Sequence, residues 1–168
     1  MKSILNLFLV LVLFSVVISC NDDNDDGTEA IEKAMDKASK SFDGMVINSS
    51  REKDDGQWVI KVLMLNEALA SVEFEYLEKD ISLIEAKGEK GPFDYEVVFD
   101  NEIINFQHAK GIAVNEAGNS LENDKLESWS VETDDDFNNK WVYDFEFYVP
   151  DKDIYIDAKT GEVLGSDS

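Results

Sequence analysis

The chain has 168 residues and is strongly acidic, because 37 Asp and Glu residues against 15 Lys and Arg give a formal net charge of −22. That charge repels nucleic acid and anionic membrane surfaces, so neither is expected as a partner, and partners should be neutral or cationic. The hydrophobic content of 43% and the aromatic content of 11% exclude a disordered chain and predict a packed core.

The first twenty residues have the pattern of an export signal. Lys2 precedes an almost wholly apolar run, Ile4 to Ile18, which is too short for a comfortable transmembrane helix. Cys20, the single cysteine, follows directly, and Val-Ile-Ser-Cys resembles the lipobox of bacterial lipoproteins, whose cysteine becomes the lipidated first residue of the mature protein. We therefore expect a signal peptide at residues 1–19, lipidation of Cys20, and membrane attachment through this lipid anchor only.

An acidic tether is expected at residues 20–28. The run NDDNDDG has no apolar residue, and acidic runs at this position resemble signals that send lipoproteins of some Gram-negative bacteria to the outer surface. The domain is thus predicted to be lipid-anchored in the cell envelope, in the outer membrane, and periplasmic or surface-exposed. The run partly matches an EF-hand loop, but Lys33 stands where that loop needs a bidentate Glu, so a calcium loop is rejected.

The first half of the folded chain is predicted to be one helix followed by strands. Apolar residues at helical spacing predict an amphipathic helix over residues 29–42. Strand patterns follow at 45–51, 57–65, 70–77 and 82–86. The second of these strands, QWVIKVLML, is apolar on both faces, so one face should cover the helix and the other needs a cover from the chain or from a partner.

The second half repeats this order after the turn-prone break GEKGP. Residues 93–99 alternate well enough to predict one more strand. Asn105 is placed to cap a second helix over 106–117, which Gly111 weakens by roughly 1 kcal/mol relative to Ala. A strand is expected next at 126–133.

The most organised stretch of the sequence is Lys140 to Leu164. Its first part alternates aromatic and acidic residues, which predicts a strand with one buried face. After a break at Pro150 the pattern restarts and ends in the turn DAKTG. There Gly161 can take a positive φ and Asp157 can accept backbone N–H bonds, so the structural turn motif is predicted to be Asp157, Thr160 and Gly161.

The two halves match in detail, which indicates a tandem duplication. GQWVIKV aligns with NKWVYDF, so that Trp58 corresponds to Trp141. The alanines of the first helix correspond to those of the second in the same way. In the first copy, residues 78–81 stand where AKTG, residues 158–161, stands in the second.

These motifs resemble the PepSY module: the string YIDAKTGEVL follows a W-V-Y-D-F strand and a helix of the HAKGIAVNEAG type. The resemblance implies one helix packed on an antiparallel sheet, and it implies that tandem relatives include lipoproteins with a larger sheet, similar to that of β-lactamase-inhibitor proteins. It also implies a link to peptidase regulation, inferred from propeptides of secreted metalloproteases.

The expected fold class is therefore α+β, with two tandem units at residues 29–100 and 101–168. The first unit is the diverged copy. Each unit should pack one helix on an antiparallel sheet of about four strands, and the two sheets can merge into one larger sheet.

The sequence contains no recognisable catalytic constellation. His108, the single histidine, is expected on a helix surface near a helix start, where an imidazolium is disfavoured. Phosphate loops, CxxC and HExxH are missing from the sequence, so we predict a protein that is not an enzyme and has neither cofactor nor metal. The alternative function is cation or small-ligand sensing by the acidic loops, formed by Asp134 to Asp136 or by Asp151, Asp153 and Asp157.

Aromatic residues favour a binding function. Tyr148 and Tyr155 have the opposite phase to the core residues of their strands, as does Val142, so they are predicted on the outer sheet face, where rigid aromatics make good contacts with a protein or peptide. The alternative, given equal weight, is that the two tyrosines serve merely to cover the sheet of the first copy. The three tryptophans, Trp58, Trp129 and Trp141, are expected in the core. The predicted function is a lipid-anchored module that binds a protein or peptide, with peptidase inhibition or regulation as the role that the resemblance implies.

Overall fold

The computed structural model describes residues 27–89, 91–100, 102–119 and 125–168. The predicted signal peptide, Cys20 and most of the tether lie outside the described residues. The described elements run in the order α1 (Thr28–Ser41), β1 (Met45–Asp54), β2 (Gln57–Leu65), β3 (Ser71–Leu77), β4 (Ser82–Glu89), α2 (Phe106–Glu116), β5 (Leu126–Asp134), β6 (Lys140–Tyr148), β7 (Asp151–Asp157) and β8 (Val163–Asp167).

The strands form a single open antiparallel sheet. Its spatial order is β1-β2-β3-β4-β5-β6-β7-β8, the same as the order along the chain. β4 pairs directly with β5, which joins the strands of the two halves into one sheet. The mixed helix and strand composition and the merged sheet agree with the sequence prediction.

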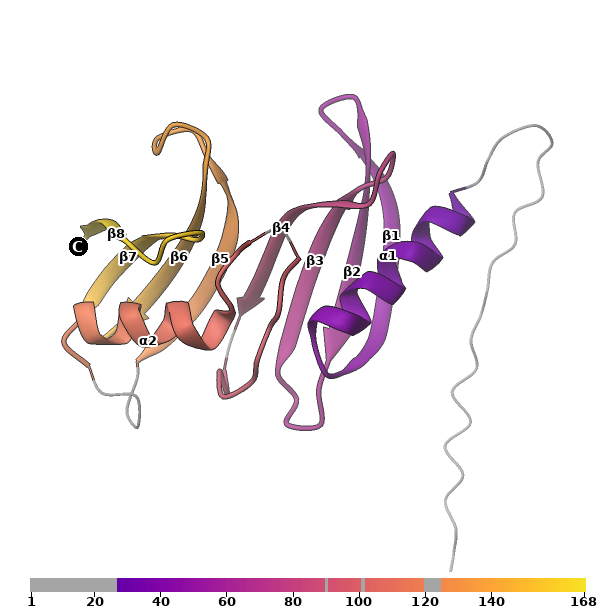
Figure 1. Cartoon of the computed structure of the whole chain (residues 1–168). Coiled ribbons are helices and arrows are strands. Elements are labelled where there is room, and N and C mark those ends of the chain that lie inside the picture. Colours follow the sequence, from indigo (N-terminus) through magenta and orange to yellow (C-terminus); the bar gives the residue numbers. More distant parts are fainter. Residues whose placement is uncertain (1–26, 90, 101, 120–124) are drawn as a thin grey trace, which may run out of the picture.

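Both helices cover the same face of the sheet (Figure 1). α1 contacts β1 and β2 and buries Ala34 and Ala38, whereas α2 contacts β6 and β7 and buries Ala109 and Ala113. Small residues at these positions let each helix approach the sheet closely. Asn105 caps α2 as the sequence predicts, because its side chain accepts a hydrogen bond from the His108 backbone N–H at 3.2 Å.

The strand predicted at residues 93–99 does not form. Apart from an isolated bridge between Val97 and Phe42, the segment has no strand pairing, because β4 and β5 already pair with each other. The segment instead fills the helix layer between α1 and α2 (Figure 1). Tyr95 lies 5.2 Å from the ring of Phe42 and 5.2 Å from that of Phe106. The alternation was thus a correct signal of burial and a wrong signal of strand pairing.

Trp129 is the largest fully buried side chain of the described core. Its Nε1–H donates a hydrogen bond to the Tyr95 hydroxyl at 2.8 Å, so the only polar atom of the indole is satisfied. Gly88 lies opposite Trp129 on β4, and a Cβ atom there would collide with both Trp129 Nε1 and the Tyr95 oxygen. The glycine leaves the space in which this buried hydrogen bond forms.

The prediction that all three tryptophans are core residues is wrong for Trp58. This side chain is 43% exposed, near the β1–β2 turn, and the Arg51 guanidinium stacks 3.8 Å from the centre of its ring. Arg51 also donates to Glu78, with Nη2 2.8 Å from Oε1. Its place at the start of β2, beside a turn, leaves the indole partly open to solvent, whereas Trp129 is buried and Trp141 packs against the core.

The β3–β4 and β7–β8 turns have the same backbone hydrogen bonds. Glu78 N–H donates to Trp58 O at 2.9 Å, and Ala158 N–H donates to Trp141 O at 2.8 Å. The turns close alike as well, from Ile81 N–H to Leu77 O and from Gly161 N–H to Asp157 O, each at 2.9 Å. Ile81 has φ 53° and Gly161 has φ 75°, so an isoleucine adopts the left-handed conformation that the second turn gives to glycine.

Candidate functional site

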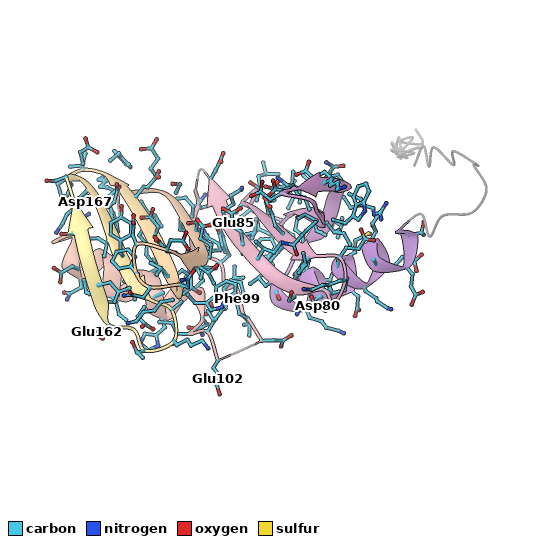
Figure 2. The ribbon with its side chains drawn as sticks, turned by 90° about the horizontal axis from the view of Figure 1, so that it is seen from above. Asp80, Glu85, Phe99, Glu102, Glu162 and Asp167 are labelled. Atoms are coloured by element: carbon cyan, nitrogen blue, oxygen red, sulfur yellow. The ribbon has the colours of Figure 1, made fainter. Side chains whose placement is uncertain are left out.

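The candidate site is the face of the sheet that neither helix covers, called here the helix-free face. Strand register assigns its residues: Ser50, Lys61 and Glu75 lie side by side on β1, β2 and β3. In the second half, Ser130, Asp144 and Tyr155 lie side by side on β5, β6 and β7. Figure 2 shows Glu85 and Asp167 on this side of the sheet, with Phe99 and Glu102 on the opposite side.

Carboxylates dominate the helix-free face. Its lysines are Lys61, Lys87 and Lys140. By register its acids are Glu52, Asp54, Glu73, Glu75, Glu85, Glu89, Glu132, Asp134, Asp144, Glu146, Asp151, Asp153, Asp157 and Asp167.

In the first half, four of these carboxylates, Glu52, Glu73, Glu75 and Glu85, have a lysine partner within the chain. Lys61 Nζ lies 2.7 Å from Glu52 Oε1 and 3.1 Å from Glu75 Oε1. Lys87 Nζ lies 2.9 Å from Glu85 Oε2 and also reaches Glu75. Burial alone would raise the pKa of Glu75, but the two lysines outweigh it and lower that pKa. Four carboxylates in this part of the face are therefore ion-paired, although the described acids here still outnumber the lysines.

In the second half the lysine that register places on this face, Lys140, is paired with Asp157. Burial, together with the nearby carboxylates of Asp153 and Glu146, raises the pKa of Asp144 to about 7. Burial, with Glu146 and Asp151 close by, also raises the pKa of Asp153. Asp144 Oδ1 is the buried side-chain oxygen that lacks a hydrogen-bond partner among the described residues. Such a group is costly unless something else binds it.

A groove of about 320 Å³ lies on the helix-free face where the two halves meet. Its lining comes from β4, β5 and β6 and includes Lys87, Glu89, Ser128, Ser130, Asp144 and Glu146. The Ser128 hydroxyl donates to Glu146 Oε2 at 2.6 Å, which holds one wall of the groove in place. The groove is open, and its polar lining combines carboxylates, two serine hydroxyls and the ammonium group of Lys87.

The two tyrosines predicted as contact residues both lie on this face. Tyr148 is 53% exposed at the end of β6, beside Asp151, with Lys125 Nζ 5.8 Å from its ring centre. Tyr155 is half-buried beside Asp144, and its ring lies 5.4 Å from that of Phe137. Val142 was predicted exposed with them, but it is only 2% exposed, so phase alone overestimated how open this face is near the β5–β6 hairpin.

Asp157 holds the last turn together. Its Oδ1 accepts the backbone N–H groups of Lys159 and Thr160, each at 3.0 Å, and its Oδ2 lies 2.9 Å from Lys140 Nζ. Burial alone would raise the pKa of Asp157, but these bonds outweigh it and hold the pKa at about 2. The Thr160 hydroxyl accepts from the Glu162 N–H at 3.3 Å, and Gly161 supplies the positive φ of the turn.

We expect Asp157→Ala to lower the free energy of unfolding at pH 7 by about 1–2 kcal/mol, because backbone donors and Lys140 lose a charged acceptor. The folded-state pKa is depressed, so this stabilisation is present above pH 4 and is lost as the pH falls toward 2. Urea unfolding at pH 7 and pH 2.5 measures both values. Asp135→Ala, in an exposed turn, is the matched control, and an equal loss in both variants would contradict the structural role.

The acidic clusters considered for cation binding do not converge. Among the described residues, no group of three or more His, Cys, Asp or Glu side chains is arranged to hold a metal ion. Asp134 Oδ1 accepts the Asp136 N–H at 2.7 Å, so that loop is folded on itself. Asp151, Asp153 and Asp157 share the helix-free face, but Asp157 is held by its turn and by Lys140. His108 is exposed on α2 and does not line the groove.

Asp144 is the residue of this site that the sequence prediction missed. Its position on the outer phase of β6 could be read from the alternation, but its missing partner could not. One sequence signal was available. When Trp58 is aligned with Trp141, Asp144 occupies the position equivalent to Lys61, so the first half has a cation where the second half has an anion.

A second hollow lies at the β1 end of the sheet. It measures about 870 Å³ and is lined by apolar and acidic side chains, among them Phe42, Met45, Leu65 and Leu69. Met45 and Leu69 are highly exposed there.

Within the part of the chain that the structure describes, none of the helices is long and apolar enough to cross a membrane.

Comparison with known proteins gives one family match. Residues 104–167 match the model of the PepSY family, described as "Peptidase propeptide and YPEB domain", so a PepSY domain covers α2 and β5–β8. A crystal structure of a "putative lipoprotein" from Clostridium difficile 630 is 23% identical, covers 83% of this chain and 90% of its own, and superposes with a TM-score of 0.36. No curated protein sequence matches the chain.

Proposed function

We propose that this chain is a non-catalytic binding protein of the cell envelope that engages a protein or peptide on its helix-free face. The observation that carries the proposal is the one-sided sheet: helices cover one face, and the other face carries Tyr148, Tyr155 and a groove in which Asp144 Oδ1 lacks a hydrogen-bond partner among the described residues. Exposed aromatic and partly desolvated polar groups on a rigid sheet are typical of protein contact surfaces.

The partner in this proposal is a peptidase or a peptide related to one. The support is the PepSY match over residues 104–167, whose family description names peptidase propeptides. In this role the chain would inhibit or regulate that peptidase by binding a surface near the peptidase active site. Cation or small-ligand sensing remains the alternative function, and a calorimetric titration with calcium that gives neither heat nor a change in melting temperature would remove it.

The chain is further proposed to be a tandem of two such units, with residues 29–100 as the diverged copy of 101–168. Support comes from the matching order of helix and four strands and from the equivalent backbone bonds at Trp58 and Trp141. We further propose that lipidated Cys20 attaches the chain to a membrane, with the outer membrane as the favoured location. Support for that step is the signal pattern of the first twenty residues.

The proposed face can be tested by replacing its aromatic contacts. We expect a Tyr148→Ala, Tyr155→Ala variant to recover much less of a specific partner from envelope extract than the unaltered chain, because two contact side chains are removed. The matched control is His108→Ala, an exposed position on the helix side, with circular dichroism to check folding. Equal recovery by all three proteins would exclude this face as the docking surface.

A further inference from the structure

The second half of the sheet has an acid at the position where the first half has an ion-paired lysine. At equivalent positions of β2 and β6, counted from Trp58 and Trp141, stand Lys61 and Asp144. Their neighbours on the preceding strands are both serines, Ser50 and Ser130. Lys61 lies between Glu52 and Glu75, whereas Asp144 lies among carboxylates. The same frame therefore carries a bound ammonium group in one half and an unmatched anion in the other.

Among the described residues, no lysine of the second half is placed to neutralise Asp144. Lys140, the lysine that register places on the helix-free face of β5–β8, is paired with Asp157 at 2.9 Å. Lys87 reaches the groove, but its ammonium group is within 3.4 Å of the carboxylates of Glu73, Glu75 and Glu85. Asp144 Oδ1 is consequently buried without a hydrogen bond from the described part of the chain.

The missing partner is better matched by a cationic side chain than by a metal ion. Calcium needs six to eight oxygen ligands that converge on one point, and the described carboxylates form no such group. A single ammonium or guanidinium group needs only one or two carboxylate oxygens, with long-range attraction from the acids around it. Asp144 lines the 320 Å³ groove, through which a cationic side chain can approach its carboxyl group, and the Tyr155 ring beside Asp144 offers an aromatic surface for that cation.

We propose that Asp144 is the anchor for a lysine or arginine side chain of the docked protein or peptide, held in the groove between β4, β5 and β6. The inference rests on the proposed function, since it names the chemistry of the partner on the same face. The bound cation reproduces, from outside, the arrangement of Lys61 in the first half. The acids of β5–β8 steer the cationic segment toward the groove, and Asp144 supplies the buried contact.

A titration of the full chain in zwitterionic detergent with pentalysine tests the anchor. We expect amide chemical-shift changes that concentrate on residues 128–131, 142–146 and 153–156, with no such pattern for pentaglutamate. In Asp144→Asn the affinity should fall roughly ten- to a hundredfold, the factor for one charge-assisted hydrogen bond. Asp144→Lys should abolish these shifts. The matched control, Asp36→Asn, removes one charge from the exposed side of α1 and should bind pentalysine like the unaltered chain.

Two results would overturn the anchor. One is an affinity for pentalysine that changes less than twofold in Asp144→Asn, or that falls by the same factor in Asp144→Asn and Asp36→Asn. Binding would then reflect the overall charge of the chain. The other is an equal response of the same residues to calcium chloride, which would assign the site to a metal ion. Melting temperatures of all variants show whether each remains folded.

The two levels of proposal fail in different ways. If partner recovery depends on Tyr148 and Tyr155 but is unchanged in Asp144→Asn, the docking face stands and the cationic anchor is wrong. If recovery is insensitive to the tyrosines while pentalysine still needs Asp144, the cation site stands and the docking face proposed above is wrong.

Discussion

Gly88→Ala is expected to lower the free energy of unfolding by about 3 kcal/mol. The new methyl group would collide with Trp129 Nε1 and the Tyr95 hydroxyl, two atoms that form a buried hydrogen bond. Overpacking of a core costs about 1–3 kcal/mol, and breaking a buried hydrogen bond adds about 1–3 kcal/mol. Chemical unfolding followed by Trp fluorescence measures the change, and the emission of buried Trp129 should shift if its hydrogen bond is lost.

Gly111→Ala is the matched control for Gly88→Ala. Gly111 lies inside α2, and an added methyl group there would have nothing within 4 Å outside its own helix turn, so alanine should raise the free energy of unfolding by up to about 1 kcal/mol through helix propensity. The two glycine-to-alanine changes should therefore have opposite signs. A small or stabilising effect of Gly88→Ala would mean that Trp129 and Tyr95 can move apart without loss.

Asp144→Asn is expected to stabilise the folded chain at pH 8 and to leave its stability unchanged near pH 4. The pKa of Asp144 is raised to about 7 from an ordinary value of 3.8, so the folded state binds a proton that the unfolded state has released. Stability contributed by this group therefore falls as the pH rises from about 4 to 7. The groups that face it are Glu132 and Asp134 on β5, Glu146 on β6, Asp153 and Tyr155 on β7, and Lys87 across the groove on β4.

The size of this effect is about 2 kcal/mol at pH 8. The full pKa difference corresponds to roughly 4 kcal/mol in a dry site, and half of that is retained because water still reaches part of the carboxyl group. Urea unfolding of the unaltered chain and of Asp144→Asn between pH 4 and pH 8 gives the difference directly. Asp36→Asn, on the exposed side of α1, should show no comparable pH-dependent gain. A constant difference across this range would show that Asp144 ionises normally.

A stabilising substitution at Asp144 also bears on function. Buried groups without partners cost stability, and proteins keep them where binding or chemistry needs them. If Asp144→Asn folds more stably and yet binds pentalysine less, loss of binding cannot be caused by unfolding. The anchor role of Asp144 is therefore supported when the substitution raises the free energy of unfolding and lowers the affinity for pentalysine.

Local sequence patterns predicted most of the helices and strands. α1 was expected at residues 29–42 and is found at Thr28–Ser41, and β2 was expected and found at residues 57–65. Asn105 was predicted as the cap of α2, and it is. These elements follow from period, caps and turn residues that act over a few neighbouring positions.

Local sequence patterns gave wrong predictions where strand pairing and tertiary packing determine the position of a residue. Residues 93–99 alternate like a strand, but direct β4–β5 pairing left them no partner, and they became the filling between the helices. Trp58 has the apolar character of a core residue, yet it lies at a turn near the edge strand and stacks on Arg51. Val142 has the phase of an exposed residue and is buried.

By itself the sequence determined the order of helices and strands, the likeness of the two halves and the side of the strands on which Tyr148 and Tyr155 lie. Each of these depends on spacing along the chain, which the sequence contains directly. Only the tertiary structure decided that both helices cover one face, that residues 93–99 complete their layer, and that Asp144 Oδ1 is buried without a partner while Lys61 has two acids. Burial and charge balance depend on neighbours from several strands, and those distances exist only in the folded sheet.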